Sequence, residues 1–207
     1  MKRKIGILFD LDGVLVDSEG EYSIFWGGMG RRYNLQSTFA SDIKGTTLQE
    51  ILLNFPEADR QGIKDELYQF EANMEYHWIP GAKEFVDELT EAGIPMAIVT
   101  SSDDAKMEKL YAKHPNLRKA ITKVVTGDMV TKSKPDPEGY LLGARLIGVP
   151  IEDCFVFEDS MQGLEAGRRS GATVIGLATT NPREKVEKLA HKTISDFVGF
   201  TIKDLER

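Results

Sequence analysis

The sequence has few of the features on which disulfide-stabilised or membrane-spanning proteins depend. Cys154 is the single cysteine among 207 residues. An internal disulfide is therefore excluded, and its apolar neighbours indicate a buried small hydrophobe. No stretch approaches the roughly 18 consecutive apolar residues of a membrane span. The apolar run after residues 1–4 ends at Asp10, too early for the core of a secretion signal. We therefore expect a cytoplasmic protein that binds no membrane.

An excess of basic residues is also absent. The chain has 26 Lys and Arg residues against 33 Asp and Glu, a net charge of -7. This balance argues against non-specific binding of nucleic acid, because such binding depends on neutralising phosphates. The length and the 41% of hydrophobic residues suit one large domain, or one domain with an insert.

Short apolar runs alternate with helical patterns over much of the chain. The runs read as buried strands at residues 4–9, 94–100, 124–125, 154–157 and 173–177. Helices are expected at residues 84–91, from 102 or 103 to about 113, at 138–147, at 160–170 and from 181 to about 189. This alternation predicts an α/β fold with a parallel sheet and right-handed crossovers.

Residues 18–78 differ from the rest because they contain only helical signals. Ser18 with Glu21 and Thr47 with Glu50 have the spacing of capping boxes. Residues 57–76 carry apolar side chains at helical spacing. We expect the glycines at 27, 28 and 30 to shorten or bend the first of these helices. An all-helical block between strand-bearing parts indicates an inserted module.

Polar residues follow several of the predicted strands. They are Asp10 and Asp12, then Thr100, Ser101 and Ser102, then Lys134, and finally Glu158 and Asp159. Because parallel strands end at one edge of a sheet, we expect these groups to converge there, where α/β proteins bind ligands.

Each group has an ordinary interpretation when taken alone. Thr100 suits a helix cap, Lys134 a solvated loop, and Glu158 with Asp159 an acidic helix start. Only Asp10 and Asp12 favour function by themselves, because neighbouring carboxylates repel and need a cation. Together the groups supply carboxylates for a divalent cation, a hydroxyl group and an ammonium group. That set suits the transfer of a phosphoryl group.

In their order along the chain, these motifs resemble those of the haloacid dehalogenase superfamily. The matching residues are Asp10-Leu11-Asp12-Gly13-Val14, Thr100, Lys134 before Pro135, and Glu158-Asp159. The resemblance covers nearly the whole chain and is closest to the β-phosphoglucomutase-like phosphatases with a helical cap. It implies a Rossmann-like core formed by residues 1–17 and 80–207, with an all-helical cap domain at residues 18–79.

The resemblance also implies catalytic roles. Asp10 would be the nucleophile that takes the phosphoryl group, and Asp12 the general acid and then the general base. Thr100 and the backbone N–H of Ser101 would hold phosphoryl oxygens. Lys134 would neutralise charge on Asp10 and on the transferring group.

A magnesium site follows from the same resemblance. Mg²⁺ would be held by the carboxylate of Asp10, the backbone carbonyl of Asp12, Asp159 and Glu158. Water would complete an octahedron around the ion.

The cap residues bear on the substrate. Tyr22 stands where sugar-phosphate mutases of this family carry a histidine, and Leu48 where they carry an arginine. A bisphosphate intermediate needs a cationic seat for its second phosphate, so the missing arginine favours hydrolysis. Lys44 could still supply one charge. Glu19, Tyr22, Lys44, Ser101 and Ser102 are our candidates for binding substrate.

We therefore expect a Mg²⁺-dependent phosphatase that hydrolyses a small phosphorylated metabolite, a sugar or polyol phosphate. The partner is a small-molecule phosphate ester, and the protein is a monomer, with a weak dimer as the alternative. A sugar phosphomutase is the main competing function. A phospho-receiver module is more remote, because receivers carry the acceptor aspartate on a middle strand and have no cap insert.

Overall fold

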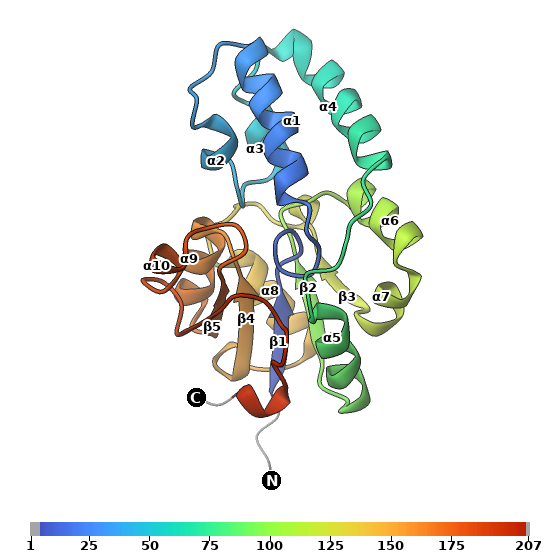
Figure 1. Ribbon diagram of the computed structural model, residues 1–207, viewed down its shortest axis with the longest axis vertical. Coiled ribbons are helices and arrows are strands. Elements are labelled where there is room, and N and C mark those ends of the chain that lie inside the picture. The colour runs from blue at the N-terminus through green and yellow to red at the C-terminus, as the bar shows by residue number, and fades with distance from the viewer. Residues whose placement is uncertain (1–4, 206–207) are drawn as a thin grey trace.

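One six-stranded parallel sheet forms the centre of the structure, a computed structural model that describes residues 5–205 apart from the side chain of Glu19. The strand order is β3-β2-β1-β4-β5-β6. The strands are β1 (Gly6–Phe9), β2 (Met96–Val99), β3 (Lys123–Val125), β4 (Cys154–Glu158), β5 (Thr173–Leu177) and β6 (Lys192–Ile194). The predicted parallel α/β fold is confirmed (Figure 1). Lys4, which the first predicted strand included, lies outside the described residues.

Strand β6 at the sheet edge was not predicted. It pairs in parallel with β5, but its three residues are exposed or half-buried. They therefore lack the continuous apolar run by which the central strands were recognised. The other five strands correspond to predicted runs: β1 and β2 are shorter than predicted, β3 and β4 are each one residue longer, and β5 has the predicted bounds.

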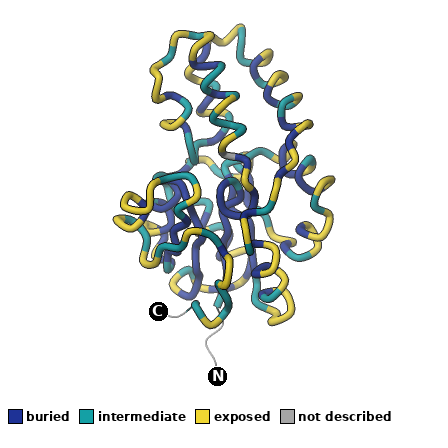
Figure 2. The backbone as a smooth tube through the Cα atoms, in the orientation of Figure 1, coloured by how far each residue is buried: buried dark blue, intermediate teal, exposed yellow. Residues whose placement is uncertain are grey.

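Helices cover both faces of the sheet, and side chains alternate between two cores. In β1, Ile7 and Phe9 face one apolar cluster and Leu8 faces the other. The first cluster packs against α5 (Ala82–Glu91), α6 (Asp104–Lys113) and α7 (Pro115–Ala120). The second packs against α8 (Glu138–Ile147), α9 (Met161–Ser170) and α10 (Arg183–Val186). Figure 2 shows the buried strands between helices whose outer faces are exposed.

Short 3₁₀ helices complete the core: η1 (Gly127–Met129), η2 (Ile151–Asp153) and η3 (Ile202–Asp204). Helix α7 was not predicted, and α10 is shorter than expected. Within residues 5–205, no helix combines the length and the apolar character needed to cross a bilayer.

Four helices form a separate block beyond the carboxyl ends of the strands, at the top of Figure 1. They are α1 (Glu19–Arg32), α2 (Phe39–Asp42), α3 (Leu48–Leu52) and α4 (Glu57–Ala72). We call them the helical block. They enclose an apolar cluster of their own that includes Trp26, Phe39, Phe55 and Ile63.

The glycines of α1 do not interrupt it, contrary to the expectation of a short or bent helix. The helix runs for 14 residues. At Gly30 an added Cβ atom would lie 3.4 Å from the ring of Phe39. That distance is an ordinary van der Waals contact, so Gly30 lies against α2, and the apolar packing of the helical block offsets the low helix propensity of glycine.

Two chain segments that lie side by side connect the helical block to the sheet. The N–H of Asp17 donates to the carbonyl of His77 at 2.7 Å, and the N–H of Ile79 donates to the carbonyl of Leu15 at 3.0 Å. Gly13 has φ +78°, in the left-handed region that favours glycine. It allows the tight turn through which the first segment leaves β1.

The C-terminal segment is anchored by Phe197, which is only 1% exposed. Its ring lies 5.4 Å from Phe85 and 5.3 Å from Phe157, measured between centroids. We expect Phe197→Ala to lower the free energy of unfolding by about 3–5 kcal/mol, because it opens a cavity among aromatic rings. Urea unfolding followed by circular dichroism measures the change.

The neighbouring residue offers a matched control. Val198 is 71% exposed, so Val198→Ala should change the stability by no more than about 0.5 kcal/mol. Equal losses in the two variants would contradict this packing of the C-terminal segment.

Candidate active site

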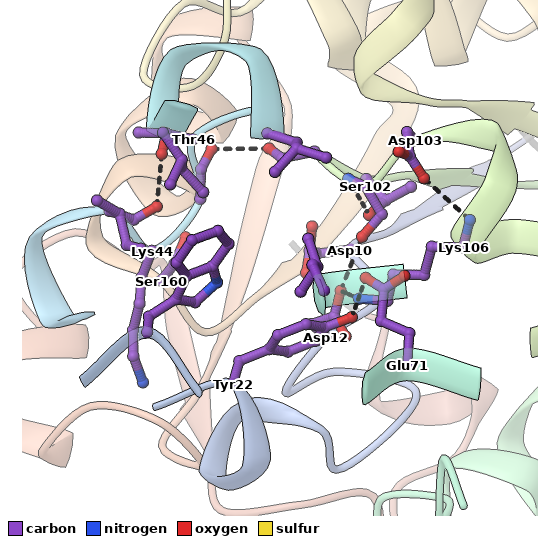
Figure 3. A pocket seen from close by; sticks show the side chains of 18 of the residues that line it. Asp10, Asp12, Tyr22, Lys44, Thr46, Glu71, Ser102, Asp103, Lys106 and Ser160 are labelled. Carbon is purple, nitrogen blue, oxygen red and sulfur yellow. Dashed lines mark hydrogen bonds and ion pairs between the residues drawn. The ribbon is translucent and has the colours of Figure 1, made fainter. Parts of the chain in front are cut away.

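A cavity of about 110 Å³ lies between the carboxyl edge of the sheet and the helical block. Figure 3 shows the side chains that line it. Of the predicted site residues, those lining it from the core are Asp10, Asp12, Thr100, Ser101, Ser102 and Asp159, and those from the block are Tyr22 and Lys44. The predicted convergence at this edge of the sheet is therefore observed.

Asp10 follows β1 directly and is held beside a buried ammonium group. Its N–H donates to the carbonyl of Phe157 at 2.9 Å, which continues the pairing of β1 with β4. The Nζ atom of Lys134 donates to Oδ1 of Asp10, to Oε1 of Glu158 at 2.6 Å and to the carbonyl of Val99 at 3.3 Å. One ammonium group thus joins two carboxylates at neighbouring strand ends.

Sharing one cation affects the ionisation of this cluster. Burial raises the pKa of the Asp10 carboxyl to about 8, against the opposing attraction of Lys134. Burial also works against the charge of Lys134, but Asp10 and Glu158 outweigh it and hold the pKa of Lys134 well above its usual range. Lys134 therefore stays charged, while a negative charge on Asp10 is costly until another cation is present.

Glu158 is fully buried, and the protein engages both of its carboxylate oxygens. Oε1 accepts from Lys134 and, at 3.2 Å, from the hydroxyl of Tyr140. Oε2 accepts from the N–H groups of Asp159 and Ser160, each at 2.7 Å, and from the Ser160 hydroxyl at 3.0 Å. These contacts hold Lys134 in place. Glu158 was predicted to bind the metal ion, but its carboxylate is directed toward hydrogen-bond donors of the protein instead.

The side chain of Asp12 lies at the edge of the cavity and accepts from three groups. The Ser18 hydroxyl donates to Oδ1. Oδ2 accepts from the Ser102 hydroxyl at 3.1 Å and from the ammonium of Lys106. These donors fix the orientation of the carboxylate toward the cavity.

The residues after β2 arrange the backbone and join the core to the block. Oγ1 of the buried Thr100 accepts from the N–H of Ser102 at 3.0 Å. The Ser101 hydroxyl donates to the carbonyl of Gly45 at 2.7 Å. Gly45 has φ +83°, and an added Cβ atom would lie 2.9 Å from the hydroxyl oxygen of Ser160. The loop before α3 therefore rests directly on the edge of the sheet.

The donor set at this edge suits a hard divalent cation. When ionised, the carboxylates of Asp10, Asp12, Glu158 and Asp159 exceed the ammonium groups of Lys134 and Lys106 by two charges. Gly13 brings the loop after β1 against Asp159, since an added Cβ atom would lie 2.2 Å from its Oδ2.

The side chains are not gathered into a metal cluster. Among residues 5–205, no three His, Cys, Asp or Glu side chains are grouped as ligands of a single ion. Mg²⁺ commonly uses one or two carboxylates, with water and substrate phosphate supplying the other ligands. The residues present therefore fit Mg²⁺ better than a cation that needs a cage of protein ligands.

The candidates from the helical block differ in what the structure shows of them. Tyr22 donates its hydroxyl to Oε1 of Glu71 at 2.9 Å, and burial raises its pKa well above the usual range. Lys44 and Leu48 line the cavity. The side chain of Glu19 lies outside the described residues, although Glu19 begins α1.

Among the charged residues of the cavity, Lys106 and Glu71 were not predicted in any functional role, and Asp103 was predicted only as a possible helix cap. Lys106 lies in the first turn of α6, and Glu71 in the last turn of α4. Each charge opposes the helix dipole at its position, where the opposite sign is favoured. A charge of the wrong sign at a helix end is visible in the sequence. It could have marked Lys106 and Glu71 as candidates, because residues that break local rules concentrate at functional sites.

Comparison with known proteins shows the family to which the chain is similar. The family model described as haloacid dehalogenase-like hydrolase matches residues 7–177. Hexitol phosphatase A of Escherichia coli (strain K12) is 34% identical over 197 residues, which cover 90% of each chain. Fructose-1-phosphate phosphatase of the same organism is 31% identical over 182 residues, 84% of this chain and 96% of that protein.

A solved structure supports the fold. The β-phosphoglucomutase of Clostridium difficile superposes with a TM-score of 0.80 at 18% identity, covering 97% of this chain and 94% of that chain. At this identity the likeness shows a shared fold.

The raised pKa of Asp10 leads to a prediction about stability. Without a metal ion, we expect the free energy of unfolding to fall as the pH rises from about 4 to about 8. The unfolded chain releases this proton near 3.8, whereas the folded protein keeps it until about 8. Ionisation therefore favours the unfolded state across this window. Urea unfolding in EDTA at several pH values measures the trend.

Two variants isolate the contribution of Asp10. Asp10→Asn lacks the titrating group and should lose less stability across the window. Asp87→Asn removes an exposed carboxylate that pairs with Lys83 and should follow the wild-type curve. A slope in Asp10→Asn as steep as that of the wild type would show that another group causes the loss.

Proposed function

This chain belongs to the family of haloacid dehalogenase-like hydrolases, and we propose that it is a Mg²⁺-dependent phosphatase acting on a sugar or polyol phosphate. The observation that carries the proposal is the buried pair of Asp10 and Lys134, which lies beside Asp12 at the cavity. The names of the E. coli relatives, a hexitol phosphatase and a fructose-1-phosphate phosphatase, support a carbohydrate-like alcohol as the leaving group.

The first step transfers the phosphoryl group to Asp10. A carboxylate oxygen of Asp10 attacks phosphorus, and the bond between phosphorus and the alcohol oxygen breaks. Asp12, held by Ser18 and Ser102, donates a proton to the departing oxygen. The products of this step are the free alcohol and an aspartyl-phosphate on Asp10.

The second step releases phosphate. Asp12 now takes a proton from water, the water oxygen attacks phosphorus, and the bond to Asp10 breaks. Inorganic phosphate leaves and the Asp10 carboxylate is restored. The same carboxyl group of Asp12 serves in both steps, because the first step leaves it without its proton.

The surrounding residues stabilise the transferring charge. Lys134 would neutralise Asp10 and a phosphoryl oxygen, while Glu158 keeps Lys134 in position. Thr100 and the backbone N–H of Ser101 would donate to the other phosphoryl oxygens.

A magnesium ion would be held by Asp10, the carbonyl oxygen of Asp12 and Asp159. When bound, it supplies positive charge to the phosphoryl oxygens and lowers the cost of ionising Asp10. We assign Glu158 to support Lys134, because donors of the protein already occupy both of its oxygens.

The cavity favours hydrolysis over mutase chemistry. Leu48 lines it at the position where the resemblance predicts an arginine in mutases, and Trp26, Ile43, Ile51 and Leu67 are further apolar or aromatic residues of this wall. Such a wall offers no pair of cations for a second phosphate. Lys44 is the described lysine that the helical block contributes to the lining.

We further propose that the helical block is a cap domain, residues 18–79, over a core formed by residues 1–17 and 80–207. In this structure it contacts the core on several sides. The Tyr68 hydroxyl donates to Asp103 at 2.6 Å, the Gln162 amide donates to the carbonyl of Asp42 at 3.1 Å, and Ser133 donates to Glu50. A cytoplasmic location and a monomeric state stay predictions.

The proposal is tested by phosphate release in the presence of Mg²⁺ from hexitol phosphates, hexose phosphates, nucleotides and pyrophosphate. We expect release from the polyol or sugar phosphates. Isomerisation of a sugar phosphate without phosphate release would favour the mutase, and turnover of pyrophosphate alone would overturn the substrate class.

Replacing the nucleophile tests the mechanism. Asp10→Asn should lower turnover by at least about 10³-fold, because the amide cannot form the acyl phosphate. Circular dichroism should show an unchanged fold, and Asp87→Asn is the matched exposed control. Turnover near the wild-type rate in folded Asp10→Asn would remove the aspartyl-phosphate mechanism.

A further inference from the structure

The ammonium group of Lys106 is buried at the cavity and is not required by the roles described above. The residue is 3% exposed and lines the cavity together with Asp10 and Asp12. It reaches the site from α6 in the core. Burying such a charge in the first turn of a helix is unfavourable both for solvation and for the helix dipole. A cation retained at this cost indicates a function at the site.

The contacts of Lys106 leave donor capacity toward the cavity. An ammonium group has three N–H donors. One goes to Oδ2 of Asp12, and the charge also lies 4.2 Å from the centroid of the Tyr22 ring. Within the described part of the chain, Asp12 is the one hydrogen-bond acceptor found for this ammonium. At least one donor therefore remains for a bound molecule.

Asp12 has two donors besides Lys106 that orient its carboxylate. The Ser18 hydroxyl donates to Oδ1, and the Ser102 hydroxyl donates to Oδ2. Two groups from different segments therefore already fix both carboxylate oxygens. The ammonium group adds a positive charge beside the proton-transferring residue and, through its remaining donor, a contact for the substrate.

We propose that Lys106 is a specificity-determining residue that donates a hydrogen bond to an oxygen on the carbon next to the ester-bearing carbon of the leaving group. The inference rests on the proposed function and deepens it. Asp12 would contact the leaving oxygen, and Lys106 contacts Asp12, so its Nζ lies within about two hydrogen-bond lengths, roughly 6 Å, of that oxygen. A vicinal hydroxyl group of the leaving alcohol falls within this reach.

Other polar side chains of the cavity lie close to the ammonium group of Lys106. Tyr22 lies under the ammonium group and donates to Glu71, which also accepts from Lys109 at 2.9 Å. Apolar side chains also line the cavity, Leu48 and Ile51 among them. The leaving group therefore meets carbon surface as well as a cation.

The test compares D-glucitol 1-phosphate with its 2-deoxy analogue, which differ only in the vicinal hydroxyl group. We expect the wild-type kcat/KM to be roughly 10- to 100-fold higher for the hydroxylated compound, the range for a hydrogen bond to a charged donor. Equal values would overturn the inference without any variant. If another panel member is the better substrate, that compound and its own deoxy analogue are compared.

Lys106→Met keeps the volume of the side chain but removes the charge. The ratio of the two kcat/KM values should fall to within about threefold of unity, while Lys106→Arg should retain part of it. Any effect that acts through Asp12 lowers kcat/KM for both compounds by the same factor, so it cancels in the ratio. Equal losses for both compounds, with the ratio unchanged, would overturn the substrate contact.

Lys113→Met is the matched control on the same helix, because Lys113 pairs with Glu75 at the surface at 3.3 Å. It should leave both values and their ratio unchanged. If Lys106→Met does not fold, the wild-type ratio and Lys106→Arg decide the matter. If the wild-type protein releases phosphate from neither compound nor any other panel member, the proposed function falls first, and this inference falls with it.

Discussion

The buried ammonium group of Lys134 is the constraint on which the rest of the site depends. It can lie between Asp10 and Glu158 only because β1 and β4 are neighbours in the sheet and end at the same edge. A buried carboxylate without hydrogen bonds would be very costly, so Glu158 must also find donors. Asp159 and Ser160, which lead into α9, supply them, and Gly163 leaves the necessary space, since an added Cβ atom would lie 1.6 Å from Oε1 of Glu158. The cluster of Asp10, Lys134 and Glu158 therefore depends on the order of the strands, on the residues that begin α9 and on the glycine at position 163.

The helical block covers the cavity but has an apolar cluster of its own. Its apolar residues are satisfied among themselves in a separate cluster. Its contacts with the core include isolated polar ones, such as Ser101 with Gly45 and Tyr68 with Asp103, and two half-buried rings, Tyr22 and Phe70, that pack against the core cluster as well. Exposed or half-buried hydrogen bonds contribute little each, on the order of 1 kcal/mol. Such an interface would open by losing weak polar contacts and the packing of these two rings, while each cluster keeps its own interior, which suits a site that must exchange substrate and product.

The sequence was sufficient for the features that depend on local patterns. Buried central strands read as apolar runs, and the polar residues at their ends located Asp10, Thr100 and Asp159. Strand β6 could not be found in this way, because an edge strand of three half-exposed residues has no apolar run. The directions in which side chains point could not be predicted from the sequence either. Adjacent positions do not reveal that Glu158 turns toward α9, or that Lys106 reaches Asp12 from another helix.

The paired segments that join the helical block to the sheet have a consequence for timing. Ser18 follows the first segment immediately and precedes α1, and its hydroxyl donates to Asp12 rather than capping the helix. Tyr22, one turn later, lies against Lys106. If the block is the cap domain proposed above, a swing about the paired segments at Leu15 and His77 would carry both away from the core in one movement. In the proposed mechanism, Asp12 would then have all of its observed hydrogen-bond partners only when the block is closed over the cavity. Closing the cavity and orienting the proposed acid would be one event, and an open site would be less able to react with water.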